Sequence, residues 1–282
     1  MTASATPERA ATGAGATYRV VIRPTRGFAF PDLRELWHYR ELVYFLAWRD
    51  IKVRYAQTLL GAAWALFQPL ALVLVFTFAF RNLANIQTED VPYPVFALAG
   101  VVFWTFFSRA VLQGSDSLVA NAALLTKIYC PRILIPVAAI VAGIVDLLLS
   151  LALFLVFAAI YGYYPTWKTV LVIPVLVVGF LFATGVTLLL SAINVRYRDV
   201  RHGLPFLVQL WLFLSPIAYP LTNPLFGLNP LVGIIDAFRW ALLATTSVDA
   251  MDVALAVGLA LATLGIGLAY FARVERTFAD YA

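Results

Sequence analysis

Six long stretches that carry at most one Asp, Glu, Lys or Arg constrain this chain more than any other feature of its sequence. A helix that crosses about 30 Å of hydrocarbon needs roughly 20 mostly apolar residues. The longest uncharged stretch has 34 residues, between Arg201 and Asp236, and the shortest has 18, between Asp90 and Arg109. We therefore predict six membrane-spanning segments, near residues 59–80, 93–112, 133–159, 169–194, 203–222 and 253–272.

These spans are predicted to be helices, because backbone groups in lipid must bond within the protein, which leaves helices or closed barrels. Barrel strands alternate apolar and polar residues, whereas runs such as 147–149 and 175–178 are apolar throughout. A soluble helical core would need polar outer faces and more charge than the 12% found here, since soluble domains carry about 25%. The expected fold is an all-α polytopic membrane protein.

The distribution of Lys and Arg predicts that both ends of the chain are cytoplasmic. With the N-terminus inside, 17 of the 20 Lys and Arg residues fall in inner segments and three in outer segments, which is the positive-inside pattern. The basic net charge therefore reflects topology, and no nucleic-acid partner is expected. We divide the chain into a disordered cytoplasmic tail (1–27), a cytoplasmic interfacial helix (28–57) and a transmembrane domain (58–282).

The segment before the first span has the pattern of an amphipathic helix. Trp37, Tyr44 and Trp48 recur at helical spacing with Arg, Lys and Glu between them. Aromatic residues on one side and basic residues on the other are typical of a helix that lies in the membrane interface. The alternative is a short soluble helix packed on another domain, but the first span begins only a few residues later.

Two inner loops carry patterns that a plain connector does not need: one has an apolar stripe and the other a high density of charge. Residues 113–132 have an apolar stripe of their own, which Pro131 ends. Residues 194–202 are highly charged, so they fix the topology and could also contact a cytoplasmic partner. The only cysteine, Cys130, lies in the first of these loops and excludes an intramolecular disulfide.

The outer segment after the fifth span is apolar enough to enter the bilayer. Residues 228–246 are short for a span, begin with Pro230, and contain Asp236 and Arg239 three positions apart. We expect re-entrant or interfacial outer helices, which membranes tolerate where the backbone is buried in protein. A seventh span is the alternative, and it would move the C-terminal arginines outside.

No catalytic or metal-binding constellation is visible, and no Gly-rich phosphate loop is present, so this chain is expected to bind no cofactor and to be no enzyme. The one charge near the middle of a span is Asp146, where ionisation costs at least about 2.5 kcal/mol. We predict that it is an intramembrane pin, either paired with a buried donor or neutral. A proton relay would need further such groups in other spans.

Aromatic side chains inside the spans are candidates for a glycan path, because their faces stack on the apolar faces of sugars. They belong to the second and fifth spans: Trp104, Phe107, Phe206, Trp211 and Tyr219. Core packing or contact with lipid is the simpler interpretation of any one of them.

Four stretches in order resemble the permeases of type-2 ABC exporters, and more narrowly the polysaccharide and polyol-phosphate branch. They are Trp48 to Pro69, Leu118 to Arg132, Tyr197 to His202 followed by Leu214 to Pro220, and Asn229 to Arg239. The second departs from the family pattern, since Asn121-Ala122 and Cys130 stand where Asn-Pro and an aromatic residue are expected.

The resemblance implies roles for residues at both faces of the membrane. Contact with the ATPase falls to Arg49, Asp50, Lys52, Arg54, Arg198, Asp199 and Arg201. The inner gate comprises Leu118, Asn121, Lys127, Tyr129 and Arg132. The outer re-entrant gate comprises Asn229, Pro230, Asp236 and Arg239.

The expected function is that of a permease subunit that exports a lipid-linked polysaccharide of the O-antigen, capsule or teichoic-acid type across the bacterial cytoplasmic (inner) membrane. The resemblance implies a homodimer with two copies of a separate cytoplasmic ABC ATPase, which binds the ATP and Mg. The alternative is a permease of the same fold for a small drug or lipid. A membrane glycosyltransferase or acyltransferase would need carboxylate or His pairs at a membrane face, and none is convincing.

Overall fold

The computed structural model describes residues 3–7, 20–24, 37–56, 63–85, 88, 91–122, 130–197, 199–220, 227–244 and 248–275. Its helices, in chain order, are α2 (Arg40–Ala56), α3 (Ala63–Phe76), the π-helical η1 (Thr77–Leu83), α4 (Tyr93–Ala120), α6 (Leu134–Ile160), the 3-10 helix η2 (Trp167–Leu171), α7 (Val172–Arg196), α8 (Val200–Phe213), α9 (Pro230–Leu243) and α10 (Ala250–Glu275). Within the segment expected to be an unstructured tail, β1 (Ala3–Pro7) pairs antiparallel with β2 (Val20–Pro24).

Five helices are long and apolar enough to cross a membrane: Ala63–Leu83, Tyr93–Ala120, Leu134–Ile160, Trp167–Arg196 and Ala250–Glu275. They coincide with five of the six predicted spans. The protein is therefore a helical multi-pass membrane protein.

The predicted fifth span, 203–222, does not form one continuous helix. Helix α8 has 14 residues, about 21 Å at 1.5 Å per residue, and the chain then turns at residues 214–217. Pro216 explains the break, because proline lacks the N–H for the helical hydrogen bond and its ring clashes with the preceding turn. Apolar composition alone did not predict this change of conformation within the stretch.

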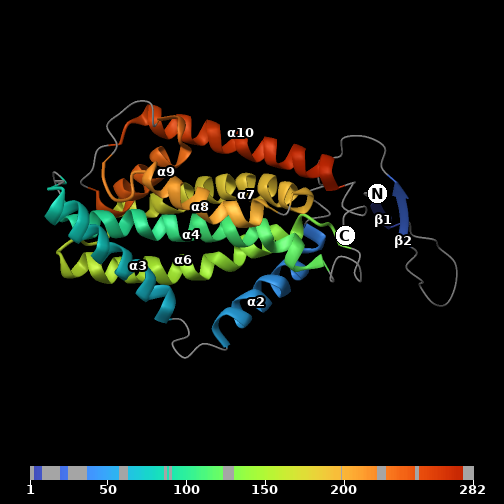
Figure 1. The fold of residues 1–282 in the computed structure, drawn as a ribbon, viewed down its shortest axis with the longest axis horizontal. Helices are drawn as coiled ribbons and strands as arrows, with labels where there is room; N and C mark the ends of the chain where they lie inside the picture. Colours follow the sequence, from blue (N-terminus) through green and yellow to red (C-terminus); the bar gives the residue numbers. More distant parts are fainter. Residues whose placement is uncertain are drawn as a thin grey trace.

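Helix α4 forms the centre of the bundle. It contacts α3, α6, α7, α8 and α9, and Figure 1 shows it running between α6 and α7. Most of its apolar residues are buried in the protein, whereas α10, which packs on α7, keeps most of its apolar surface exposed. A helix that is apolar all round can sit either in the core or against lipid, and these two helices show both cases.

The contact between α7 and α10 depends on two glycines. A Cβ at Gly267 would lie 2.3 Å from the carbonyl oxygen of Gly185, and a Cβ at Gly185 would lie 2.6 Å from the backbone nitrogen of Leu264. Small residues let the backbones of two membrane helices come into contact, and van der Waals packing then holds the helices together. The two glycines therefore set the position of the last span.

Replacing Gly267 with alanine should separate α7 from α10 and destabilise the protein by about 1–3 kcal/mol, the usual cost of overpacking. Thermal unfolding of the purified protein in detergent measures the loss. Gly265→Ala is the matched control, because the added Cβ meets nothing within 4 Å, and it should be neutral or slightly stabilising. Equal melting temperatures for the two variants would contradict this account of the contact.

Candidate functional site

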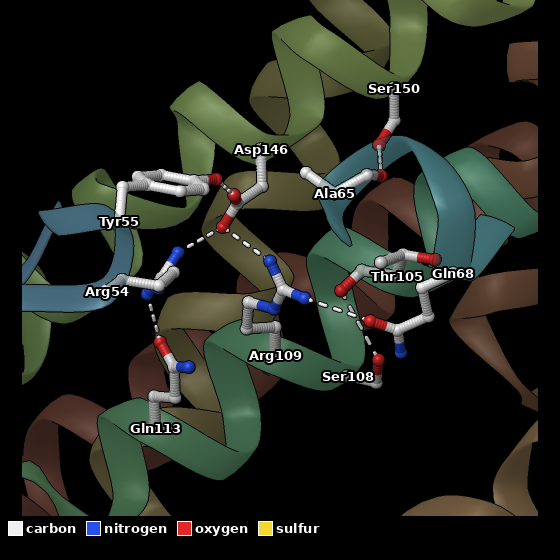
Figure 2. Close-up of polar contacts among 10 residues, drawn as sticks. All are labelled: Arg54, Tyr55, Ala65, Gln68, Thr105, Ser108, Arg109, Gln113, Asp146 and Ser150. Carbon is white, nitrogen blue, oxygen red and sulfur yellow. Dashed lines mark hydrogen bonds and ion pairs between the residues drawn. The ribbon is translucent and has the colours of Figure 1, made fainter. Parts of the chain in front are cut away.

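A cluster of charged and polar side chains lies in the middle of the bundle, around Asp146 of α6 (Figure 2). The Asp146 side chain is only 2% exposed. Its carboxylate accepts hydrogen bonds from Arg54 and from the hydroxyl of Tyr55, both at the end of α2. It also forms an ion pair with Arg109 of α4, with 2.6 Å between Nη1 and Oδ2. The buried carboxylate therefore has three partners, and its role as a pin stays a prediction.

The two arginines extend the cluster to further helices. Arg54 also donates to Gln113 on α4, and Arg109 donates to Gln68 on α3 at 3.1 Å. Nearby, the Ser150 hydroxyl of α6 lies 3.5 Å from the Ala65 carbonyl oxygen of α3. The cluster thus joins α2, α3, α4 and α6, and its two cations and one anion leave one positive charge in excess.

Most of the described residues expected to contact an ATPase lie at the end of the bundle predicted to face the cytoplasm, where α4 and α10 end (Figure 1). Arg54 is the exception, because it lies in the middle of the bundle against Asp146. Arg49 bonds both Asp50 of its own helix and the Asn121 side chain at the end of α4, each at 2.8 Å. Lys52 and Asp199 are exposed. Arg201 is 57% exposed and forms an ion pair with Asp116 at 3.2 Å, while Arg198 lies outside the described residues.

The predicted inner gate is described only in part. Leu118 is buried, and Asn121 ends α4 in contact with Arg49. Arg132 donates to the Glu275 carbonyl oxygen at 3.1 Å and so joins the beginning of α6 to the end of α10. Lys127 and Tyr129 lie outside the described residues.

At the opposite end of the bundle, Arg239 of α9 joins three parts of the chain. This side chain is fully buried. It donates to the Phe96 carbonyl oxygen of α4 at 3.3 Å, to the Ile217 carbonyl oxygen at 3.0 Å, and to Asp236 at 3.2 Å. Its guanidinium carbon lies 3.7 Å from the centroid of the Phe96 ring, which adds a cation–π contact.

Two further side chains donate, like Arg239, to backbone carbonyl oxygens of the non-helical segment 214–220. The carbonyl oxygen of Leu214 accepts from Asn229 at 2.9 Å, and that of Ala218 accepts from the Tyr93 hydroxyl at 2.6 Å. Asn229 also caps α9 by accepting from the backbone N–H of Leu231, next to Pro230 at the first helical position. We call Tyr93, Asn229 and Arg239 the outer clamp.

Gly100 of α4 makes room for the outer clamp. A Cβ at this position would lie 2.7 Å from the Arg239 guanidinium and 3.1 Å from the Ile217 Cα. A larger residue would therefore push away both the cation and the backbone that it binds.

The predicted glycan-path residues are mostly packed inside this subunit. Phe107 is buried, stacks on Phe182 with 5.3 Å between ring centroids, and meets the Trp211 ring edge-on at 5.3 Å. Trp104 is buried, and Tyr219 is partly buried against Phe80. Phe206, at 64% exposed, is the member of the set whose ring is open to an outside contact.

Sequence reasoning missed how these charges pair. No partner for Asp146 was predicted, and the structure pairs it with Arg109 and Arg54. One signal was present, since a carboxylate in a span needs a cation within reach. Arg54 shortly precedes the first predicted span, and Arg109 lies within the second. Nothing in the sequence indicated that Tyr93 would donate to the Ala218 carbonyl oxygen, or that Gly100 would leave room for Arg239.

Comparison with known proteins identifies the fold family. Residues 41–243 match the family described as ABC-2 type transporter. The chain belongs to this family.

Its relatives include an O-antigen export system permease protein of Myxococcus xanthus, 32% identical over 73% of this chain and 82% of that protein. A permease protein of the same description from Klebsiella pneumoniae is 25% identical over 85% of this chain and 94% of its own length. The polysialic acid transport protein of Escherichia coli is 23% identical over 79% of this chain and 89% of its own length. Among the residues that the structure describes, no group of three or more His, Cys, Asp or Glu could hold a metal ion.

Replacing Gly100 with alanine should displace Arg239 and weaken its hydrogen bond to the Ile217 carbonyl oxygen in the non-helical segment 214–220. We expect a loss of about 1–3 kcal/mol in stability, read as a lower melting temperature in detergent. Gly143→Ala is the matched control, because its added Cβ would make only ordinary contacts with Phe106 at 3.6 Å. An unchanged melting temperature for Gly100→Ala would show that the outer clamp contributes little.

Proposed function

We propose that this protein is the permease subunit of a type-2 ABC exporter that moves a lipid-linked polysaccharide of the O-antigen or capsule kind across the bacterial cytoplasmic membrane. The observation that carries the proposal is that three relatives with such names align over 82–94% of their own lengths. Teichoic-acid chains belong to the same class of substrate. In this proposal the subunit works as a homodimer with two copies of an ABC ATPase.

The inner end of the bundle supports the place assigned to the ATPase. Here Arg49 of α2 bonds the end of α4 through Asn121. Arg201, at the beginning of α8, pairs with Asp116 of α4. A partner that pushes on α2 or α8 therefore acts on the central helix of the bundle.

We propose six crossings, with both termini cytoplasmic, although the fifth crossing is only partly helical. Helix α8 begins beside the inner end of α4, where Arg201 meets Asp116. By residue 218 the chain has reached Tyr93, the first residue of α4 at the outer end. The turns at 214–217 therefore complete the crossing that α8 begins, and α9 is an outer helix that lies between the fifth and sixth crossings.

The apolar side of α8 supports the proposed dimer and the proposed path. Phe206, Leu207, Leu210 and Phe213 are all at least 44% exposed. In this arrangement a second copy covers part of this side, and Phe206 borders the space through which the polymer passes. Trp104 and Phe107, which are buried, act by supporting Trp211 rather than by touching the polymer.

The topology can be tested with single cysteines and an impermeant thiol reagent added outside intact cells. A cysteine in place of Tyr164 or Asp249 should react, and one in place of His202 or Arg273 should not. The native Cys130 gives little background, because its burial raises the pKa of the thiol and keeps the thiolate scarce. Labelling at Arg273 but not at Asp249 would mean that residues 200–220 do not complete a crossing.

The coupling role can be tested by reversing two charges at once, with Arg49→Glu and Lys52→Glu. The variant should still insert, but lose the bond to Asn121, bind the ATPase less tightly and export less polymer. We expect at least a tenfold loss of binding, about 1.4 kcal/mol. Co-purification of the ATPase and surface polymer in cells are the two measurements.

A matched control for this variant is Glu41→Gln on the same helix, which removes a charge outside the coupling run. Normal ATPase binding and normal export in the double reversal would overturn the proposed coupling surface. Normal surface polymer in cells that lack this chain altogether would overturn the proposed function itself.

A further inference from the structure

The carboxylate of Asp146 is shared by arginines from two different helices. Arg54 of α2 and Arg109 of α4 both reach the same oxygen, Oδ2, while Tyr55 bonds Oδ1. Each arginine also has a second partner, since Arg54 donates to Gln113 and Arg109 donates to Gln68. Neither cation therefore depends on the carboxylate alone. We call Arg54, Arg109 and Asp146 the charge seat.

Sharing one oxygen makes the two ion pairs compete. Two guanidinium groups near one carboxylate repel each other, so each weakens the other's hold on it. Yet a buried carboxylate that loses its only cation is strongly destabilised. With two cations present, one can leave while the other keeps Asp146 paired. Arg54 can therefore separate from Asp146 while Arg109 keeps the carboxylate paired, so that no unpaired charge is left in the bundle.

Helix α2 packs on α6 through a narrow apolar strip formed by Leu42, Val43 and Leu46. Of its 17 residues only Leu46 and Ala47 are buried, and its aromatic side chains, such as Trp48, are largely exposed. Elements with few buried apolar contacts are the ones that move at low cost. The polar contacts of Arg49 and Arg54 add to this narrow strip and tie α2 to α4 as well as to α6.

We propose that the charge seat is the point at which motion of α2 reaches the middle of the bundle. Arg54 leaves and returns to Asp146 during each transport cycle, while Arg109 keeps the carboxylate paired. Asp146 and Arg109 are then positioning residues, which deliver the motion to α6 and α4 in addition to the path along the chain into α3. The purpose of this motion rests on the proposed function, but the contacts belong to this chain and can be tested in it alone.

The first test measures hydrogen exchange of the backbone amides of α2 in the purified permease without any partner. Arg54→Gln should speed this exchange at least about tenfold, the value of one charged hydrogen bond. Arg109→Gln should slow it about twofold, because removing a neighbouring like charge strengthens the remaining pair. Arg54→Lys should restore most of the protection, and Arg40→Gln, on the exposed first turn of α2, should change nothing.

Opposite effects of Arg54→Gln and Arg109→Gln distinguish the charge seat from a static pin. In a static pin each arginine only adds stability, so both variants would speed exchange. Faster exchange in Arg109→Gln, or no change in Arg54→Gln, would overturn the inference. Melting temperatures of the same samples show whether either variant has simply lost its fold.

The second test uses the exporter assembled with its ATPase and measures hydrolysis and polymer export together. Arg54→Gln should keep hydrolysis within about twofold of the wild-type rate and lose export at least about tenfold, because the push no longer reaches the bundle. Arg109→Gln should lower hydrolysis and export together, since α2 is held more firmly. Equal export per ATP in wild type and both variants would overturn the inference. Export that is independent of ATP in the wild type would instead overturn the proposed function, and the exchange measurements would still decide the charge seat.

Discussion

A backbone carbonyl or N–H in hydrocarbon has no water to bond, and this constraint decides where the chain can depart from a helix. The segment 214–220 departs from a helix inside the bundle, and other side chains supply donors for its carbonyl oxygens. Asn229, Arg239 and Tyr93 donate to the carbonyl oxygens of Leu214, Ile217 and Ala218. The position of α9 follows from the same need, since two of these three donors come from its first residues and its middle. The break in α8 and the presence of an outer helix are therefore one feature of the fold.

The same constraint applies more strongly to charge, and it explains why the buried ions stand where several helices meet. Asp146 is reached from α2 and α4, and Arg239 from α4, α9 and the segment after α8. A charge inside a membrane protein is tolerated when partners replace its hydration, and several helices must supply them. Each ion therefore fixes the relative positions of the helices that serve it.

The sequence predicts the class of fold well because the prediction depends on the number of consecutive residues with almost no charge. Charge-free stretches of about 20 residues must lie in lipid or in a core, and five of the six appear as spanning helices. The predicted fifth span is not one continuous helix, and composition cannot tell a helix from turns whose carbonyls are bonded by distant residues such as Tyr93. Pro216 was the one local sign of the break. The partners of Asp146 were hidden for the same reason, since Arg54 is 92 residues away in the chain.

The sites of Arg239 and Arg54 differ in whether the arginine shares its acceptor with a second cation, and this difference affects which of them can move. Arg239 bonds two backbone carbonyls and a carboxylate on its own helix, and no competing cation among the described contacts shares its acceptors. Its departure would leave the buried guanidinium without these bonds and the Ile217 carbonyl oxygen without this donor, which makes the outer clamp costly to open. Arg54 shares its acceptor with Arg109, so its departure leaves Asp146 paired. In the proposed exporter, α9 therefore belongs to the firmer, outer end and α2 to the more easily moved, inner side, which is the asymmetry expected of a bundle driven from the cytoplasm.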